Sequence, residues 1–163
     1  MLYFAYGSNM SIRRFRERVP SAKFVSVCML AKHKLKFHKA GNDGSGKCDA
    51  AETGNNENTV VGVAFDISES EKTGLDRYEG LGAGYEEKVV EVISTEGEVL
   101  HAITYYATKT DPSLRPYHWY KEHVMRGAKE NGLPAGYIQS IESIESVPDP
   151  KKERHENEMA IYL

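Results

Sequence analysis

The sequence lacks the features that mark several classes of protein. It has only two cysteines, Cys28 and Cys48, in 163 residues. That is too few for a disulfide framework and is typical of thiols that stay reduced. No apolar run is as long as a membrane span, and no signal peptide precedes the first apolar segment. We therefore expect a cytoplasmic protein with no membrane partner.

An excess of basic charge is also missing. Lys and Arg number 21 against 24 Asp and Glu, for a net charge of −3, so nothing in the composition favours a nucleic-acid partner. Four arginines do cluster, but they fall around one short predicted helix and indicate a solvated face: Arg13, Arg14, Arg16 and Arg18.

Signatures of metal, nucleotide and covalent chemistry are absent as well. The six histidines show no metal-ligand spacing, and there is no Gly-x-Ser-x-Gly elbow or Cys/His pair. Residues 41–47 satisfy most of the phosphate-loop pattern, but Cys48 stands where a hydroxyl is required and no helix is predicted after it. We expect no metal and no cofactor.

What the sequence does contain predicts an α+β fold. Apolar runs at residues 2–6, 24–30, 35–37, 60–65, 89–93 and 99–107 predict strands. Helices are predicted over residues 11–18, 68–78 and 114–131, with a shorter one after Pro134. Gly127 weakens the expectation that the third helix is continuous. This order favours a mixed sheet curled into a small β-barrel with flanking helices.

The length is that of a single domain, which we place at residues 1–147. Residues 148–163 are charged and contain proline, and predict a surface tail. Its last five residues are apolar, so they either pack on the barrel or serve a homodimer.

The first candidate site is the turn that ends the N-terminal strand. The strand stops at Gly7, Ser8 and Asn9, residue types that favour a tight turn with exposed backbone N–H groups. Ser11 then offers an N-cap for the next helix. A strand, turn and helix in this order present amide donors that suit a carboxylate.

The second candidate is Glu79. Ser68 and Glu71 have capping-box spacing at the start of the predicted helix, and Gly80 is suited to end it in the left-handed conformation. Glu79 therefore falls in the last turn, where the helix dipole disfavours negative charge and burial would act the same way. A carboxyl of this kind can accept and donate a proton near neutral pH. Many of the ten tyrosines lie in the second half of the chain, and buried hydroxyls there would line a polar pocket.

Three motifs carry a family resemblance. They are Tyr-Phe-Ala-Tyr-Gly-Ser-Asn at residues 3–9, Leu-Asp-x-x-Glu-Gly at 75–80 and Gly-Ala-Lys-Glu-Asn-Gly-Leu-Pro at 127–134. Together they resemble the γ-glutamylcyclotransferase family, in order, over roughly residues 2 to 140. The first motif is shared with γ-glutamylamine cyclotransferases and with an enzyme that trims a γ-glutamyl cap in aminoglycoside biosynthesis.

The resemblance implies roles for particular residues. It assigns the α-carboxylate end of a glutamyl group to the turn, with the preceding strand completing the pocket edge: Tyr3, Phe4, Ala5, Tyr6, Gly7, Ser8 and Asn9. The family's catalytic glutamate falls on Glu79. Its pocket tyrosines match Tyr105 and Tyr120, and also Tyr85, where the glycine-rich residues 80–84 make the spacing less certain.

The reaction so implied is intramolecular. The α-amine of a γ-glutamyl substrate attacks its own γ-carbonyl, giving 5-oxoproline and a free amine, with Glu79 as general acid and base. Two alternatives stay open: a γ-glutamylamine cyclotransferase or cap-removing biosynthetic enzyme, and a module that binds a γ-glutamyl-like ligand without turnover.

Overall fold

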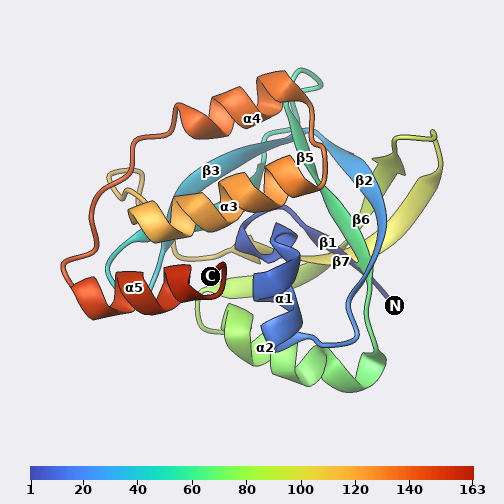
Figure 1. Ribbon diagram of the computed structural model, residues 1–163. Helices are drawn as coiled ribbons and strands as arrows, with labels where there is room; N and C mark the ends of the chain where they lie inside the picture. Colours follow the sequence, from blue (N-terminus) through green and yellow to red (C-terminus); the bar gives the residue numbers. More distant parts are fainter.

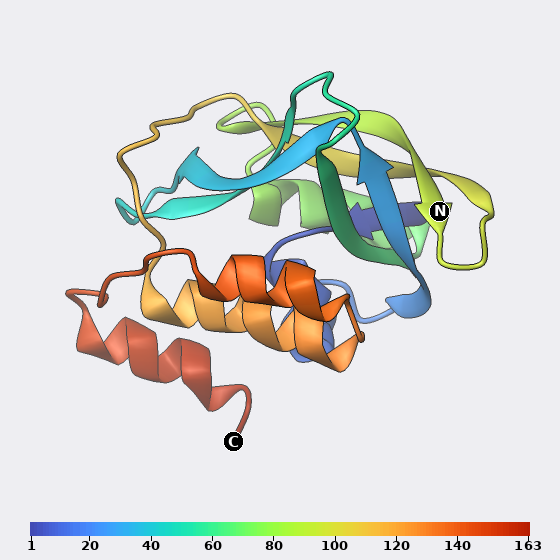
Figure 2. The same cartoon turned by 90° about the horizontal axis from the view of Figure 1, so that it is seen from above.

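Five strands close into a barrel in the order β1-β5-β2-β6-β7, and β3 and β4 form a separate two-stranded sheet. The computed structural model describes residues 1–163, and Figure 2 shows α1, α3, α4 and α5 gathered on one side of the strands. The strands, labelled in Figure 1, are β1 (Leu2–Ala5), β2 (Lys23–Ala31), β3 (His33–Ala40), β4 (Gly46–Glu52), β5 (Thr59–Asp66), β6 (Tyr85–Ser94) and β7 (Val99–Ala107). The helices are α1 (Ile12–Arg18), α2 (Lys72–Glu79), α3 (His118–Glu130), α4 (Ala135–Glu142) and α5 (Lys152–Ala160), with 3-10 turns η1 (Ser8–Met10) and η2 (Glu69–Glu71). The predicted α+β barrel is confirmed.

Strand β1 closes the barrel. It pairs antiparallel with β5 and parallel with β7, with Tyr3 opposite Phe65 on one side and Ile103 on the other. Because β1 has neighbours on both edges, its residues Tyr3, Phe4 and Ala5 are almost completely buried. A short apolar run with no alternation is typical of such a strand.

Strand β4 was not predicted from the sequence. Its segment is poor in β-branched and aromatic residues, which are the types enriched in strands. In the structure β4 pairs with β3 and buries Cys48 and Ala50. An ideal Cβ at Gly46 would lie 2.2 Å from the carbonyl oxygen of Phe37. Glycine at this position therefore allows β3 and β4 to lie close together.

Helix α2 ends as predicted but begins differently. Gly80 adopts φ 70° and ψ 47°, the left-handed conformation expected of a C-terminal glycine. The capping box at Ser68 and Glu71 is wrong, because no side chain caps this end. The carboxylate of Glu71 accepts hydrogen bonds from the backbone and hydroxyl of Ser21 instead. Glu71 thus ties the start of α2 to the segment before β2.

Helix α3 runs without a break through Gly127. It begins at His118, after the predicted start, because Pro116 lies in the segment before it. An ideal Cβ at Gly127 would lie 2.6 Å from the carbonyl carbon of Met10 and from the backbone nitrogen of Ser11. Gly127 therefore lets α3 lie directly against the backbone of η1.

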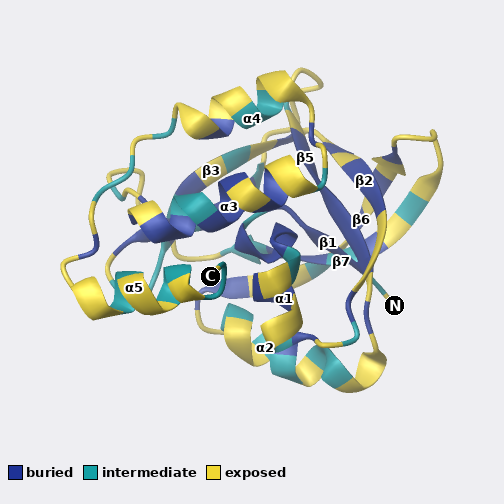
Figure 3. Ribbon diagram, viewed as in Figure 1, coloured by how far each residue is buried: buried dark blue, intermediate teal, exposed yellow.

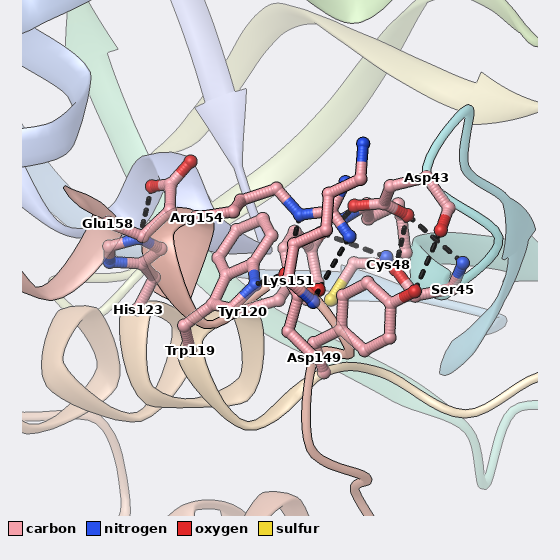
Figure 4. Close-up of polar contacts among 12 residues, drawn as sticks. Asp43, Ser45, Cys48, Trp119, Tyr120, His123, Asp149, Lys151, Arg154 and Glu158 are labelled. Atoms are coloured by element: carbon pink, nitrogen blue, oxygen red, sulfur yellow. Dashed lines mark hydrogen bonds and ion pairs between the residues drawn. The ribbon is translucent and has the colours of Figure 1, made fainter. Parts of the chain in front are cut away.

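Residues 148–163 include a helix, α5, that the sequence prediction left out. Most of its surface is exposed in Figure 3, but Glu158 reaches inward to Arg14 at 2.7 Å and to the buried ring of His123 at 2.9 Å. Figure 4 shows the Glu158–His123 contact beside the hydrogen bond from Trp119 to Asp149. The apolar end contacts the same chain, because Met159 packs against the core.

No helix of the structure has the length and apolarity needed to cross a membrane.

The contact between α3 and η1 generates a stability prediction. Gly127→Ala should destabilise the fold by about 1–3 kcal/mol, since the added methyl group meets backbone atoms that have little freedom to retreat. That loss corresponds to a fall in Tm of about 2–4 °C per kcal/mol for a chain of this size. The measurement is thermal unfolding followed by circular dichroism.

The matched control is Gly74→Ala in α2, where an added Cβ has open space. Its higher helix propensity should stabilise by about 0.5–1 kcal/mol. Equal Tm shifts for the two variants would contradict close backbone packing at Gly127.

Candidate active site

One small cavity collects residues from the N-terminal strand and turn, from the middle of the chain and from helix α3. Its volume is about 30 Å³, and it lies where β1 ends against the last turn of α2. Its lining residues are Tyr3, Tyr6, Gly7, Ser8, Asn9, Cys48, Glu79, Tyr85, Tyr105 and Tyr120. We refer to it as the inner cavity.

The turn after β1 supplies hydrogen-bond donors to the inner cavity. No carbonyl or side chain of the protein accepts a hydrogen bond from the N–H of Gly7, and the hydroxyl of Ser8 is likewise without a partner, although the residue is only 8% exposed. An ideal Cβ at Gly7 would lie 2.9 Å from Cβ of Cys48, so only glycine allows β4 to approach this closely. Donors left free at a buried turn suit an anionic ligand.

Glu79 faces this turn with one oxygen held and one free. The side-chain nitrogen of Asn9 donates to Oε1 of Glu79 at 2.7 Å. That nitrogen also lies 3.1 Å from the hydroxyl of Tyr3. Oε2 of Glu79 makes no hydrogen bond within the protein. This free oxygen can take a proton from a ligand.

The tyrosines use their hydroxyls mainly to hold the walls together. Tyr85 donates to the carbonyl of Cys48 at 2.6 Å, and Tyr120 accepts from the N–H of Cys48 at 2.9 Å. Tyr6 donates to the carbonyl of Tyr105 at 2.5 Å. Burial raises the pKa of Tyr6, Tyr85 and Tyr120 well above its ordinary value, so these phenols stay neutral.

Tyr105 completes the wall next to α2. Its hydroxyl donates to the carboxylate of Asp76 at 2.5 Å, and Asp76 also pairs with Lys72. Asp76 belongs to the same helix turn as Glu79. The tyrosine therefore joins β7 to the end of α2, and its buried hydroxyl has a raised pKa.

Cys48 lines the cavity but is not suited to act as a nucleophile. Burial raises the pKa of its thiol to about 12, so almost no thiolate exists near neutral pH. The peptide group of Cys48, clamped by two tyrosines, is the part that shapes the site.

An outer cleft of about 250 Å³ adjoins the inner cavity and shares Ser8, Glu79, Tyr85 and Tyr120 with it. The rest of its wall is strongly basic and carries four cations: Arg14, Arg18, Lys39 and Lys47. Two of them are paired, Arg14 with Glu158 and Lys47 with Asp43 at 2.8 Å. The hydrogen bonds of Asp43 are drawn in Figure 4.

The other two cations of the outer cleft have no such partner. No carboxylate lies within 4.0 Å of Lys39 or Arg18. Lys39 is only 8% exposed, and its ammonium lies 4.6 Å from the centre of the Tyr85 ring. Burial lowers the pKa of Lys39, an effect that the charge of Glu79 opposes. A buried cation with no carboxylate in direct contact can bind an anion that enters the cleft.

Comparison with known proteins identifies the family of this chain. The sequence profile of the AIG2-like family matches residues 59–141. Curated γ-glutamylcyclotransferases from Bos taurus and Homo sapiens are 37% and 35% identical to this chain over 150 residues, covering 88% of this chain and 78% of each relative. The chain belongs to the γ-glutamylcyclotransferase family. A solved structure of a γ-glutamyl cyclotransferase has a TM-score of 0.86 at 32% identity, with 99% of this chain and 98% of that chain covered. The family and the enzyme class predicted from the sequence are confirmed.

In this cyclotransferase the inner cavity unites most of the residues predicted for the site. Phe4 and Ala5 do not line it, because both are fully buried in the core. Their backbone leads directly into the turn, and the carbonyl of Phe4 accepts a hydrogen bond from the hydroxyl of Thr104.

Sequence reasoning missed three residues of the cyclotransferase site: Arg18, Lys39 and Cys48. Arg18 was assigned to a solvated helix face. Cys48 was noted as a reduced thiol and where it breaks the phosphate-loop pattern. Lys39 follows a predicted strand, with a glycine-rich loop shortly after, and no local pattern distinguishes it from the chain's many surface lysines.

Proposed function

We propose that this cyclotransferase converts a γ-glutamyl amino acid into 5-oxoproline and the free amino acid, with Glu79 as general acid and base. The observation that carries the proposal is the inner cavity itself. It sets the free oxygen of Glu79 and the free donors of Gly7 and Ser8 around one small space. Those donors suit the α-carboxylate of a glutamyl group, and the carboxylate of Glu79 suits its α-ammonium.

The first chemical step is a proton transfer. At neutral pH the α-nitrogen of the substrate is mostly an ammonium and has no lone pair. Oε2 of Glu79 accepts one proton, while Oε1 stays bound to Asn9. The α-nitrogen then attacks the γ-carbonyl carbon, because fixing the α-carboxylate at the turn holds the chain in a folded shape.

The second step breaks the γ-amide bond. Glu79 returns the first proton to the departing nitrogen, and the carbon–nitrogen bond to the leaving group cleaves. The freed carboxylate then takes the second proton from the ring nitrogen and passes it to the released amine. The α-nitrogen loses two protons in all, and the leaving nitrogen gains two and departs as an ammonium. The reaction therefore balances without water and without a covalent enzyme intermediate.

The outer cleft favours an amino acid as the leaving group over a simple amine. Lys39 is a buried cation with no carboxylate within 4.0 Å, and it lies beside Tyr85 at the junction of cleft and cavity. The α-carboxylate of a leaving amino acid would supply the missing counter-charge. A leaving group that carries a second cation, such as a γ-glutamylated lysine side chain, would meet like charge instead.

We also propose that the enzyme works in the reducing cytoplasm. Both of its cysteines are free and buried, and reduced thiols of this kind are typical of that compartment.

Glu79→Gln should lower turnover at least about a hundredfold, the scale of a lost general acid–base. The amide keeps an oxygen for Asn9, so folding and substrate binding should be preserved. Formation of 5-oxoproline from γ-glutamyl-alanine, followed by NMR, measures the change. Glu86→Gln, at an exposed carboxylate on β6, is the matched control, and near-normal turnover by Glu79→Gln would remove Glu79 from the mechanism.

Lys39→Met should raise KM for γ-glutamyl-alanine about tenfold or more, since a hydrogen bond to a charged group contributes about 1.5–3 kcal/mol. With γ-glutamyl-ethylamide, whose leaving group has no carboxylate, KM should change little. Lys36→Met, at an exposed residue of the same strand, controls for lost charge. An equal effect on both substrates would argue against Lys39 as the carboxylate partner.

Alkylation of the protein under denaturing conditions, directly on cell lysis, should label both Cys28 and Cys48. Intact mass spectrometry reads the result. A disulfide-linked species trapped in this way would contradict a reducing compartment.

A further inference from the structure

The orientation of the Asn9 side-chain amide controls which of its atoms faces the carboxylate of Glu79. Asn9 is 3% exposed, and it is the only residue that hydrogen-bonds to the carboxylate of Glu79. A primary amide can sit in two orientations that exchange its oxygen and its nitrogen. In one, an N–H points at the carboxylate. In the other, the amide oxygen faces the carboxylate oxygen and repels it.

The neighbouring hydroxyl of Tyr3 does not decide between these orientations. It lies 3.1 Å from the Asn9 nitrogen, and a phenol can either donate or accept. If the amide turned over, Tyr3 could donate to the amide oxygen without loss.

Arg18 does decide. Its guanidinium donates to Oδ1 of Asn9 at 3.2 Å, and a guanidinium has no acceptor atom. The amide oxygen must therefore face Arg18, which leaves the amide nitrogen facing Glu79. Arg18 ends α1, and its guanidinium lies over the ring of Tyr78 at 5.0 Å, so the residue next to Glu79 holds the arginine in place.

We infer that Arg18 is a positioning residue that acts on Glu79 through Asn9, keeping the amide N–H on Oε1. This inference rests on the proposed role of Glu79 as the acid–base. Arg18 also contributes a positive charge near the site that no carboxylate within 4.0 Å neutralises.

The other titratable groups around Glu79 are either uncharged or unchanged in the test, so the effect is assigned to Arg18. The five tyrosines and Cys48 of the inner cavity remain neutral because burial raises their pKa values. The other cations of the outer cleft beside Glu79 are Arg14, Lys39 and Lys47, and all three are unchanged in the variants compared below.

The test compares Arg18→Met with Arg13→Met, a matched substitution at an exposed residue of the same helix. Arg18→Met should lower kcat about tenfold or more, the scale of a lost hydrogen bond to a charged group. Arg18→Lys, which keeps a charged donor, should recover most of the activity, and Arg13→Met should match the wild type.

Two further measurements separate positioning from substrate binding. The loss in kcat should be the same for γ-glutamyl-alanine and γ-glutamyl-ethylamide, because Asn9 acts on the acid–base and not on the leaving group. In an Asn9→Leu background, Arg18→Met should cause little additional loss. A rise in KM confined to γ-glutamyl-alanine, with kcat unchanged, would overturn the inference and make Arg18 a carboxylate ligand.

Failure of the proposed function has a different result. The proposed function fails if the wild type forms no 5-oxoproline, or if Glu79→Gln has normal turnover. The positioning role of Arg18 fails if Arg18→Met has wild-type kinetics while Glu79→Gln is inactive.

Discussion

The double pairing of β1 is the constraint on which the site depends. This four-residue strand has β5 along one edge and β7 along the other, so its path leaves little freedom. The chain passes from β1 directly into the turn at Gly7. The hydrogen bond from the hydroxyl of Tyr6 to the carbonyl of Tyr105 also fixes the residue that follows β1 to strand β7. Helix α3 then packs on the far side of the turn through Gly127. The turn is therefore held from both sides before any ligand binds.

Within that frame the polar groups divide into two sets. Tyr6, Tyr85 and Tyr105 donate to partners inside the protein. Their hydroxyls hold the walls and remain neutral because they are buried. The groups left free are the N–H of Gly7, the hydroxyl of Ser8 and one oxygen of Glu79. Such a division gives a small site a rigid outline and few, well-placed contacts to a ligand.

Local patterns predicted much of the framework. The strands at residues 60–65 and 99–107 and the glycine end of α2 at Gly80 were predicted because their signals lie within a few residues of one another. Strand β4 was missed because its own residues have little strand propensity, and pairing with β3 stabilises it. Gly127 was taken as a weak point in α3, although its purpose is contact with Met10, far away in the sequence.

The sequence by itself determined the family, through three motifs, and with it the barrel and the candidate residues Glu79 and Gly7 to Asn9. Only the tertiary structure decided how those residues are oriented and what surrounds them. The hydrogen bonds from Arg18 to Asn9 and from Asn9 to Glu79 join residues of α1, η1 and α2. Lys39 is an unpaired cation only because β3 is folded so that it is buried beside Tyr85. Burial and hydrogen-bond partners depend on contacts between distant segments, and one residue's type and its sequence neighbours do not specify them.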